Sequence, residues 1–462
     1  MLENQVYFNF NDIKNIFSSE VIHNFQNNWN CKGVSIDSRN LKRGNLFIAI
    51  KGENNDGHNY IQSSLENGAS AIIANQDWFL NNQSFISDYP HVIVKNTYQA
   101  LGLLANYHRR RFNIPIIAIA GSNGKTTTKE MAAHLLSQKY NVLKTYRNYN
   151  NQIGLPLMLF QLDNSYDIGV FELGTNEPGE MATLTKISEP NFGLITNIGK
   201  EHLEKLIDID GVEFEETLLY GWLHKTGGLA FINMEDERLN KYYHILENKF
   251  SYSLSLQTNL IANIEIDEQL KPTLNLIYKE RNITAQLQTY GYASALNATA
   301  ASAISLYFEL SDEEISTGLE TYTPEKWHGY GRMFIEKRKY LTIINDCYNA
   351  NPSSMEIALN SIKNYNFNGE KIAVLGDMKE LGDCSFEEHK KILEQAIKCV
   401  DKILLYGDEM KRALKEFEDY QNIKHFETHK DIAEELSKVK EETLMLLKGS
   451  RGMKMEEILN VL

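Results

Sequence analysis

The chain has 462 residues, which at roughly 150 residues per domain corresponds to about three domains and excludes a single small binding module. Hydrophobic residues make up 42% and charged residues 23%, and this ordinary balance excludes a mostly disordered or collagen-like chain. The net charge of −14 argues against broad binding to nucleic acids or anionic membranes, because both require basic patches.

Cysteine usage and the start of the chain bear on the cellular compartment. The four cysteines are scattered, without CxxC pairs or a dense framework, which fits reduced thiols. The first residues lack the basic start and apolar core of a secretory signal, and no run approaches the roughly 18 apolar residues that span a bilayer. We therefore expect a cytoplasmic protein without membrane insertion, and we predict a monomer.

The first quarter of the chain alternates short β-rich runs with amphipathic stretches. Strands are expected at residues 45–51, 71–75 and 91–95, and helices at 60–67 and 97–111. This alternation predicts an α/β domain over residues 1–112.

The central part of the chain opens with a buried-strand candidate at 114–121, a glycine-containing turn and a helix at 125–138. Later elements are strands expected at 168–174, 192–197 and 228–234, a strand-rich antiparallel flank at 251–290, and a helix at 294–309. The spacing predicts a mainly parallel sheet with crossover helices over residues 113–323.

A third unit is predicted over residues 324–462. Gly329 and Gly331 lie close together near its start, and we expect a hinge there. Strands are expected at 340–345, 371–377, 402–408 and 443–450, with a helix after Pro352. This order is typical of a Rossmann-like domain, so the fold class is α/β throughout.

The segment GSNGKTTT lies between the first strand and the first helix of the central domain, where a phosphate loop belongs. Glycines let backbone N–H groups approach phosphates, Lys125 adds a positive charge, and the Thr126 hydroxyl can ligate Mg²⁺. Ile119 stands where the general GxxxxGK[ST] pattern has its first glycine, and a purely structural Gly/Ser turn is the alternative. The predicted ATP-binding residues of this loop are Gly121, Ser122, Asn123, Gly124, Lys125, Thr126 and Thr127.

Two metal-ligand candidates follow neighbouring strands. Glu172 lies at the C-terminal end of the strand expected at 168–174, and His202 follows the strand expected at 192–197. Ligands collect at the carboxyl edge of parallel sheets, and a triphosphate requires a metal. Either residue alone could be an ordinary surface or capping residue.

Several longer runs carry a family resemblance. GSNGKTTTKEM, TYRNYNNQIGLP, ELGTNEPGE and NIGKEHL resemble the central domain of the Mur ligases, the ATP-dependent amide-forming enzymes of peptidoglycan synthesis. Residues 34–61 look like the UDP-binding domain of these ligases. The C-terminal runs at 346–359, 375–382 and 448–458 are similar to the member that adds D-alanyl-D-alanine to UDP-N-acetylmuramoyl-tripeptide.

This resemblance implies a reaction and a division of roles. The tripeptide carboxylate attacks ATP to give an acyl phosphate, and the amino group of D-alanyl-D-alanine then displaces phosphate. The implied catalytic residues are Lys125 at the β- and γ-phosphates, Glu172 with Thr126 at a first Mg²⁺, and His202 at a second. Domain closure would keep water from the acyl phosphate.

The sequence departs from the family at one position. Mur ligases usually carry a carbamoylated lysine about fourteen residues after the metal-binding histidine, and this helix contains Glu213, Glu215 and Glu216 instead. Alignment favours Glu216 as the replacement metal ligand, with Glu215 as the alternative. A solvated acidic helix face is the competing interpretation.

The remaining implied contacts follow the resemblance. For the UDP precursor they are Ser35, Asp37, Ser38, Arg39, Lys51, Asp56, Gly57, His58, Asn148, Asn150 and Asn151, several of which would otherwise be turn formers. For adenosine they are Asn297, Arg332 and Asp346, and on the D-alanyl-D-alanine side Asn349, Asn351, Ser450 and Arg451.

Two rival functions stay open. A folylpolyglutamate-synthase-like ligase shares the central domain and the chemistry, although the UDP-type N-terminal run argues against it. A catalytically weak UDP-precursor binder is the other rival, because the family lysine is missing. No short motif tells whether the third peptide residue is lysine or diaminopimelate.

Overall fold

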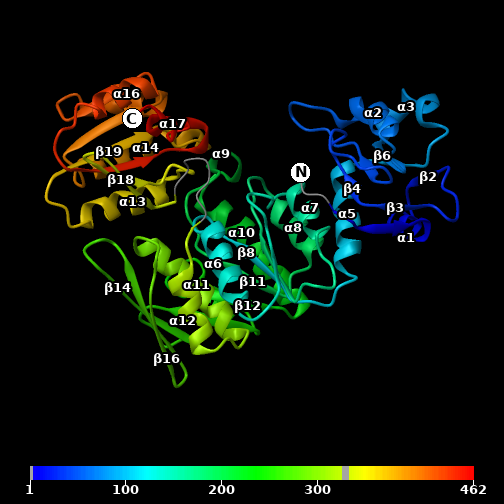
Figure 1. Cartoon of the computed structure of the whole chain (residues 1–462), viewed down its shortest axis with the longest axis horizontal. Helices are drawn as coiled ribbons and strands as arrows, with labels where there is room; N and C mark the ends of the chain where they lie inside the picture. The colour runs from blue at the N-terminus through cyan, green and yellow to red at the C-terminus, as the bar shows by residue number, and fades with distance from the viewer. Residues whose placement is uncertain (1–3, 325–331) are drawn as a thin grey trace. The chain divides into compact units, whose positions relative to one another are not determined.

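The structure is a computed structural model that describes residues 4–324 and 332–462, so the predicted hinge at Gly329 and Gly331 lies outside the described residues (Figure 1). The chain divides into two compact units. The first holds the residues up to Ala118 with Tyr140–Gly174 and Glu180–Asn191, and the second holds the remainder from Ile119 onward. These units cut across our boundaries at 112/113 and 323/324, which stay predictions.

The N-terminal sheet of the first unit has five strands in the order β2-β7-β6-β5-β4. The strands are β2 (Val21–His23), β4 (Val34–Ser35), β5 (Leu46–Ile48), β6 (Ala71–Asn75) and β7 (His91–Val94). β4 to β7 are mutually parallel, and β2 joins β7 antiparallel. Buried Phe47, Ile72 and Ile93 form part of the core beneath them. The three strands and two helices predicted here are confirmed, with α2 at Ile61–Glu66 and α5 at Thr97–Arg109.

The short strands β1 (Tyr7–Asn9), β2, β3 (Asn30–Lys32), β4 and β9 (Val142–Lys144) of this unit were not predicted. β1 and β3 pair antiparallel as a separate two-stranded sheet. The same unit contains β10 (Ile168–Glu172), which runs parallel to β9. β10 ends at Glu172, two residues before the predicted end of this strand, and Glu172 lies at its C-terminal end as expected.

The first strand of the central sheet is β8 (Ile116–Ala120). The boundary between the two units falls within this strand, between Ala118 and Ile119. The further strands of the sheet are β11 (Phe192–Ile195), β12 (Leu229–Asn233), β13 (Lys249–Ser253), β14 (Leu260–Ile266), β15 (Pro272–Tyr278) and β16 (Arg281–Gln286). β11 to β14 are parallel, and β14, β15 and β16 are antiparallel. The predicted antiparallel flank is therefore confirmed.

Helices of the central part carry the site residues. They are α6 (Lys125–Leu136), α9 (Leu203–Leu206), α10 (Ile209–Thr226), α11 (Tyr292–Tyr307) and α12 (Asp312–Thr321). α6 begins at Lys125 directly after the left-handed Gly124, so the phosphate-loop segment leads into a helix N-terminus. α11 is rich in alanine and serine on its buried side and packs on α6.

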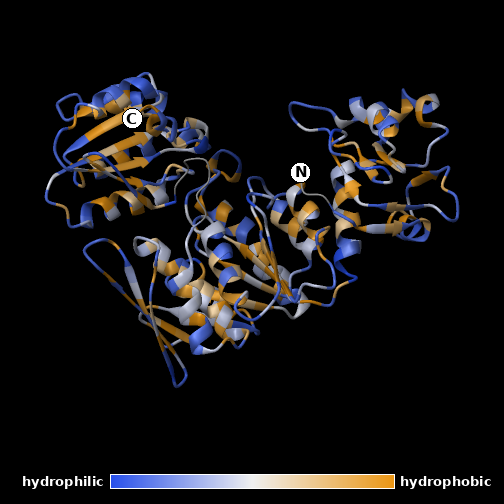
Figure 2. Cartoon of the chain, viewed as in Figure 1, coloured by the Kyte–Doolittle hydropathy of each residue, from blue (hydrophilic) through white to orange (hydrophobic). Residues whose placement is uncertain are grey.

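The C-terminal sheet has the order β17-β18-β22-β19-β20-β21. Its strands are β17 (Phe334–Arg338), β18 (Leu341–Asn345), β19 (Glu370–Gly376), β20 (Lys402–Tyr406), β21 (Ile423–Phe426) and β22 (Thr443–Lys448). The last five are parallel, and β17 pairs antiparallel with β18. Figure 2 shows these strands in orange between bluer helices, which include α13 (Pro352–Asn364), α14 (Ser385–Ala396) and α15 (Asp408–Leu414). The Rossmann-like prediction is confirmed.

None of the helices within residues 4–324 and 332–462 is long and apolar enough to cross a membrane.

Candidate nucleotide and metal site

The phosphate loop has the backbone that its glycines permit. Gly121 has φ +112° and Gly124 has φ +82°, a region that residues with a Cβ rarely adopt. A Cβ at Gly121 would lie 2.7 Å from the backbone nitrogen of Thr196, and one at Gly124 would overlap the side chain of Asn297. Both positions therefore require glycine.

Side chains of the following strand and loop hold this segment in place. The Ser122 amide donates to the Asn197 carbonyl (2.9 Å), and the Asn123 amide donates to Asn197 Oδ1 (3.1 Å). Ser122 Oγ accepts from the Gly199 amide (2.8 Å). Asn197 was not singled out from the sequence, although it begins the NIGKEHL run. Because the loop is tied down at several atoms, it is organised before a ligand arrives.

Asn297 was predicted to contact adenosine, and the structure places it against the start of α6. Its Oδ1 accepts from the Thr128 hydroxyl (3.2 Å) and lies beside Gly124. Lys125, Thr126 and Thr127 occupy the first turn of α6. These three side chains lie at the positive end of the helix dipole, where anions are favoured.

Lys125 contacts an acid that sequence reasoning missed. Its Nζ lies 3.3 Å from Glu201 Oε2 and 3.4 Å from the Ser122 carbonyl. Glu201 is 7% exposed, and its Oε1 makes no hydrogen bond with any residue that the structure describes. The ammonium group therefore stands beside a carboxylate with spare oxygen capacity.

The side chain of Glu216, on α10, contacts the phosphate loop. Its side chain is fully buried, and Oε2 accepts from the Gly121 amide at 2.8 Å. Oε1 is buried and has no hydrogen-bond partner within residues 4–324 and 332–462. Burial raises the pKa of Glu216 to about 7, with Lys125 opposing the rise and Glu201 adding to it. A buried acid with an unused oxygen at a phosphate loop has the properties of a ligand site.

The alternative of a solvated acidic face on α10 is wrong. Glu213, Glu215 and Glu216 are 8%, 1% and 0% exposed. Glu215 accepts from the Gly179 amide (2.8 Å) and the Thr175 hydroxyl (3.2 Å), and Glu213 pairs with Arg238 (2.7 Å). Glu216 therefore contacts the phosphate loop, whereas Glu215 contacts the 175–179 segment.

His202 lies just before α9 in the left-handed region, with φ +50°. Its Nδ1 is 2.5 Å from Glu380 Oε2, and its Nε2 is 3.8 Å from Glu201 Oε2. Burial alone would lower the pKa of His202, but the carboxylates of Glu380 and Glu201 outweigh it, so the pKa is raised.

The donor set fits Mg²⁺ held partly by substrate phosphates. Within the described residues, no three His, Cys, Asp or Glu side chains form a cluster that could hold a metal unaided. Mg²⁺ usually takes only one or two carboxylates from the protein and completes its shell with phosphates and water. The unused buried oxygens of Glu216 and Glu201 supply that chemistry.

Glu172 and the residues that contact it belong to the first unit. Glu172 is 3% exposed, its Oε1 accepts from Asn150 Nδ2 (2.8 Å), and its amide donates to Thr145 Oγ1 (2.9 Å). Asn151 Oδ1 instead accepts from the Gly154 amide (2.9 Å) at the start of α7 (Gly154–Leu159), and Asn148 is exposed. Of the three predicted asparagines, the structure brings Asn150 to Glu172.

The predicted UDP-precursor residues form two local clusters. Arg39 forms a two-point contact with Asp37, with Nε–Oδ1 2.9 Å and Nη2–Oδ2 2.7 Å. His58 Nδ1 lies 2.6 Å from Asp56 Oδ1, and His58 Nε2 accepts from the Asn75 amide at 3.0 Å. Both ring nitrogens of His58 are thus engaged inside the protein, and the ring organises the turn.

Backbone and side-chain positions complete this region. Ser35 Oγ donates to the Asp37 carbonyl (3.0 Å), and the Ser38 carbonyl accepts from Asn67 (3.1 Å). A Cβ at Gly57 would lie 2.7 Å from the Ile50 amide, whereas the Lys51 side chain is exposed. Lys51 and Arg39 are the cations of this set that face solvent.

The predicted adenosine contacts of the C-terminal domain cluster beside β18. Arg332 stacks over the Tyr348 ring at 3.9 Å, and the Met333 amide donates to Asp346 Oδ1 (3.1 Å). Lys448, 2% exposed and not predicted, donates to Asp346 Oδ2 (2.6 Å) and to the Asn349 carbonyl (3.0 Å). The buried ammonium group fixes the loop that carries Asp346.

The protein residues predicted to face D-alanyl-D-alanine fall into two groups. Asn351 caps α13 and donates through Nδ2 to Asn123 Oδ1 of the phosphate loop (2.9 Å). Ser450 Oγ accepts from the Lys379 amide (2.8 Å), and Arg451 pairs with Glu456 (2.9 Å). Asn351 reaches the nucleotide loop, while Ser450 and Arg451 contact their own domain.

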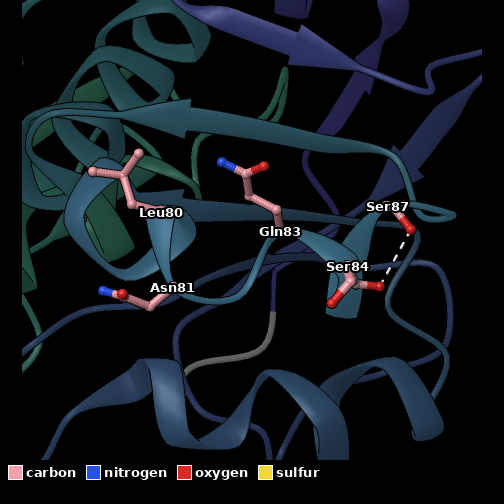
Figure 3. Close-up of a pocket in the computed structure, with 5 residues that line it drawn as sticks. All are labelled: Leu80, Asn81, Gln83, Ser84 and Ser87. Atoms are coloured by element: carbon pink, nitrogen blue, oxygen red, sulfur yellow. Dashed lines mark hydrogen bonds between the residues drawn. The ribbon is translucent and has the colours of Figure 1, made fainter.

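A shallow pocket on the N-terminal domain lies apart from every predicted residue. Figure 3 shows its lining, which is uncharged: Leu80, Asn81, Gln83, Ser84 and Ser87. None of these five residues is among the predicted site residues.

Family models match three consecutive parts of the chain. They are the Mur ligase family catalytic domain at residues 30–109, the Mur ligase middle domain at 119–305 and the Mur ligase glutamate ligase domain at 331–451. The chain therefore belongs to the Mur ligase family, and the predicted three α/β domains are confirmed.

Particular relatives narrow the resemblance. The chain is 32% identical over 438 residues to the UDP-N-acetylmuramoyl-tripeptide–D-alanyl-D-alanine ligase of Bacillus subtilis, covering 92% of each chain. Its fold is similar to the crystal structure of MurF from Acinetobacter baumannii, with a TM-score of 0.87, 28% identity and 99% of each chain covered. MurF ligase from Thermotoga maritima in complex with ADP gives a TM-score of 0.81 at 25% identity, covering 93% of this chain and 96% of that one.

Proposed function

We propose that the chain is an ATP-dependent ligase that joins D-alanyl-D-alanine to UDP-N-acetylmuramoyl-tripeptide in peptidoglycan precursor synthesis. The observation that carries this proposal is the match, over 92% of the chain, to the Bacillus subtilis ligase of that name. The phosphate loop with Lys125 at its helix N-terminus supplies the nucleotide chemistry. We also propose a cytoplasmic monomer, in keeping with the sequence.

The reaction needs activation because a carboxylate resists attack by an amine. A terminal carboxylate oxygen of the tripeptide attacks the γ-phosphorus, the bond to the β–γ bridging oxygen breaks, and ADP leaves. The amine of D-alanyl-D-alanine then attacks the carbonyl carbon of the acyl phosphate and phosphate leaves. Lys125 would exchange Glu201 for the phosphates of ATP, and its charge would steady the migrating phosphoryl group.

Mg²⁺ bound here would neutralise phosphate charge as the phosphoryl group moves. We propose Thr126 and Glu172 as ligands of one ion, and His202 and Glu216 as ligands of a second. Support for Glu216 as the counterpart of the family's carbamoylated lysine comes from its unused buried oxygen and its bond to Gly121. Because a glutamate needs no CO₂, we expect activity to be independent of added bicarbonate, and a strong dependence would contradict this assignment.

The other site assignments also stand as proposals. The exposed cations Arg39 and Lys51 suit the diphosphate of the UDP precursor, and Arg332 stacked on Tyr348 offers a flat cationic surface for the adenine base. Asn351, held against the phosphate loop, is suited to face the incoming dipeptide.

The test is release of phosphate by the purified protein with each candidate tripeptide, lysine or diaminopimelate at the third position, with and without D-alanyl-D-alanine. We expect phosphate release that requires ATP, a UDP-muramoyl tripeptide and the dipeptide together. Turnover on a folate acceptor would support the folylpolyglutamate-synthase alternative. Tight binding of the UDP precursor without any turnover would support the precursor-binder alternative, and either result would contradict the proposal.

A further inference from the structure

A turn of the C-terminal domain contacts the histidine of the metal site. Glu380, in the loop after β19, accepts at its backbone carbonyl from the Glu204 amide of α9 (3.2 Å). A Cβ at Gly382 would lie 3.2 Å from Glu204 Cα, so the two backbones approach closely. The 380–382 turn and α9 therefore form a close contact between the C-terminal and central parts of the second unit.

The side chain of Glu380 sets the state of the His202 ring. Oε2 lies 2.5 Å from Nδ1, so Nδ1 carries the hydrogen and donates it. The tautomer that results leaves the lone pair of Nε2 available on the opposite side of the ring, toward Glu201.

We propose that Glu380 is a positioning residue that orients His202 and fixes its tautomer, so that Nε2 is presented as a ligand for a divalent cation. A carboxylate behind the ring of a metal-binding histidine is the usual arrangement in metalloproteins, where it holds the ring and strengthens the ligand. Because this carboxylate comes from the C-terminal domain, the metal site is complete only when that domain is docked. The inference rests on the proposed function.

Two further contacts link the same two parts of the second unit around the phosphate loop. Lys200 Nζ lies 2.7 Å from Glu388 Oε1, and Asn351 Nδ2 lies 2.9 Å from Asn123 Oδ1. Lys200 and Asn123 lie close in the chain to His202 and Lys125 respectively. Docking of the C-terminal domain is thereby coupled to both the nucleotide loop and the histidine.

The backbone around α9 is strained, which fits a segment held by outside contacts. His202 has φ +50°, and Ile207 has φ +74° and ψ −61°. The Asp208 amide donates to the Leu206 carbonyl (2.9 Å), which closes a tight three-residue turn at the β-branched Ile207.

The test measures Mn²⁺ binding directly, by electron paramagnetic resonance, in the full-length protein with a non-hydrolysable ATP analogue. Three variants are compared: Glu380→Ala, Glu380→Gln and Asp383→Asn. Gln keeps an acceptor for Nδ1, whereas Ala removes it. Asp383 lies in the same loop and is exposed, so its variant removes a charge without touching His202.

We expect wild type to bind two Mn²⁺ ions, and Glu380→Ala to weaken the second by roughly 10- to 100-fold. Glu380→Gln should restore most of that affinity, and Asp383→Asn should match wild type. In the ligase assay the Ala variant should lose kcat with little change in KM for the UDP precursor. Thermal melting of each variant checks that it is folded.

Wild-type binding of a single Mn²⁺ ion, or Glu380→Ala binding both ions as wild type does, would overturn the inference. An equal loss in Asp383→Asn would do so too, because it would show a general charge effect. Failure of the proposed function is a separate result, since it would be seen as absence of product from the wild-type protein in the ligase assay.

Discussion

Two buried acids in the second unit show how similar positions serve different ends. Asp377 follows β19 at the carboxyl edge of the C-terminal sheet, and Glu216 reaches the loop at the carboxyl edge of β8. Both side chains are 0% exposed. Asp377 accepts from the Met410 amide (2.9 Å) and the Glu409 amide (3.3 Å) at the start of α15.

The two acids differ in their hydrogen bonding, and this difference distinguishes a structural acid from a candidate ligand. Asp377 uses both oxygens within the fold, which is the pattern of a helix cap. Glu216 uses one oxygen and keeps the other buried without a partner among the described residues, at a cost reflected in a pKa raised by burial to about 7. Because this unused oxygen lies at the phosphate loop, it is available to a ligand bound there.

The largest effect is expected from Lys125→Ala. Loss of the ammonium group removes the positive charge beside the migrating phosphoryl group, so ligase turnover should fall by roughly 10³-fold or more. The measurement is ADP formation in the presence of both acceptor substrates. Lys225→Ala, an exposed lysine in the last turn of α10, is the matched control and should leave turnover unchanged. Undiminished turnover in Lys125→Ala would refute the phosphate-loop assignment.

Separate substitutions of the neighbouring glutamates Glu215 and Glu216 of α10 test whether a buried acid serves as a metal ligand or as a structural hydrogen-bond acceptor. Glu216→Gln should lower activity by roughly 10- to 100-fold and raise the Mg²⁺ concentration needed for turnover. Glu215→Gln should lower stability by about 1 kcal/mol, because it weakens the bonds to Gly179 and Thr175, while the Mg²⁺ dependence stays the same. Mg²⁺ titrations and thermal melts of both variants are the measurements. The reverse pattern would place the ligand at Glu215.

His108 extends the comparison to a buried group that lies in the first unit and is not one of the predicted site residues. Its Nε2 hydrogen-bonds to the Leu162 carbonyl (3.0 Å), and its buried Nδ1 has no partner among the described residues. Burial lowers the pKa of His108 from 6.5 to about 4. The unfolded chain therefore binds more protons than the folded one between these values, and stability falls as the pH is lowered through that window.

The free energy of unfolding falls by about 3 kcal/mol in total once the pH is below both pKa values of His108, that of the unfolded chain and that of the folded chain. Urea unfolding across the window should show a steeper loss of stability in wild type than in His108→Gln, which keeps a donor for Leu162. Parallel curves for the two proteins would exclude His108 as the source.

Asp377→Asn should have the smallest effect. It should cost about 1 kcal/mol of stability, because the neutral amide caps α15 less well than the carboxylate does. Mn²⁺ binding and turnover should stay at wild-type levels. A melting curve measures the stability of the variant, and a Mn²⁺ titration measures its metal binding. Weakened Mn²⁺ binding with unchanged stability would contradict the structural role given to Asp377.

Much of the fold was predictable because its main elements are long buried strands and periodic helices. β6 occupies residues 71–75 as predicted, β10 ends at Glu172, and α13 begins at Pro352. The short strands β1 and β3 were missed, since three residues carry no period. Their pairing depends on contacts made across the chain.

The site was predictable where one continuous run carries it. The loop at Gly121–Lys125 and the residue His202 could be found from such runs. Glu201, Glu380 and Lys448 also lie in such runs, but their roles could not be inferred from them. Their roles come from partners distant in sequence, as in the Lys448 contact with Asp346. The acidic run on α10 was ambiguous because charged residues are usually exposed, and only its packing against the phosphate loop identifies Glu216.

The central claim is that a carboxylate becomes an acyl phosphate before the peptide bond forms, and labelled oxygen tests it most directly. The UDP-muramoyl tripeptide would carry ¹⁸O in its reacting carboxylate, and the released phosphate would be analysed by mass spectrometry after one round of turnover with ATP and D-alanyl-D-alanine. The acyl-phosphate route predicts phosphate that carries one ¹⁸O atom from the tripeptide. Phosphate without the label, released together with dipeptide-coupled product, would contradict it.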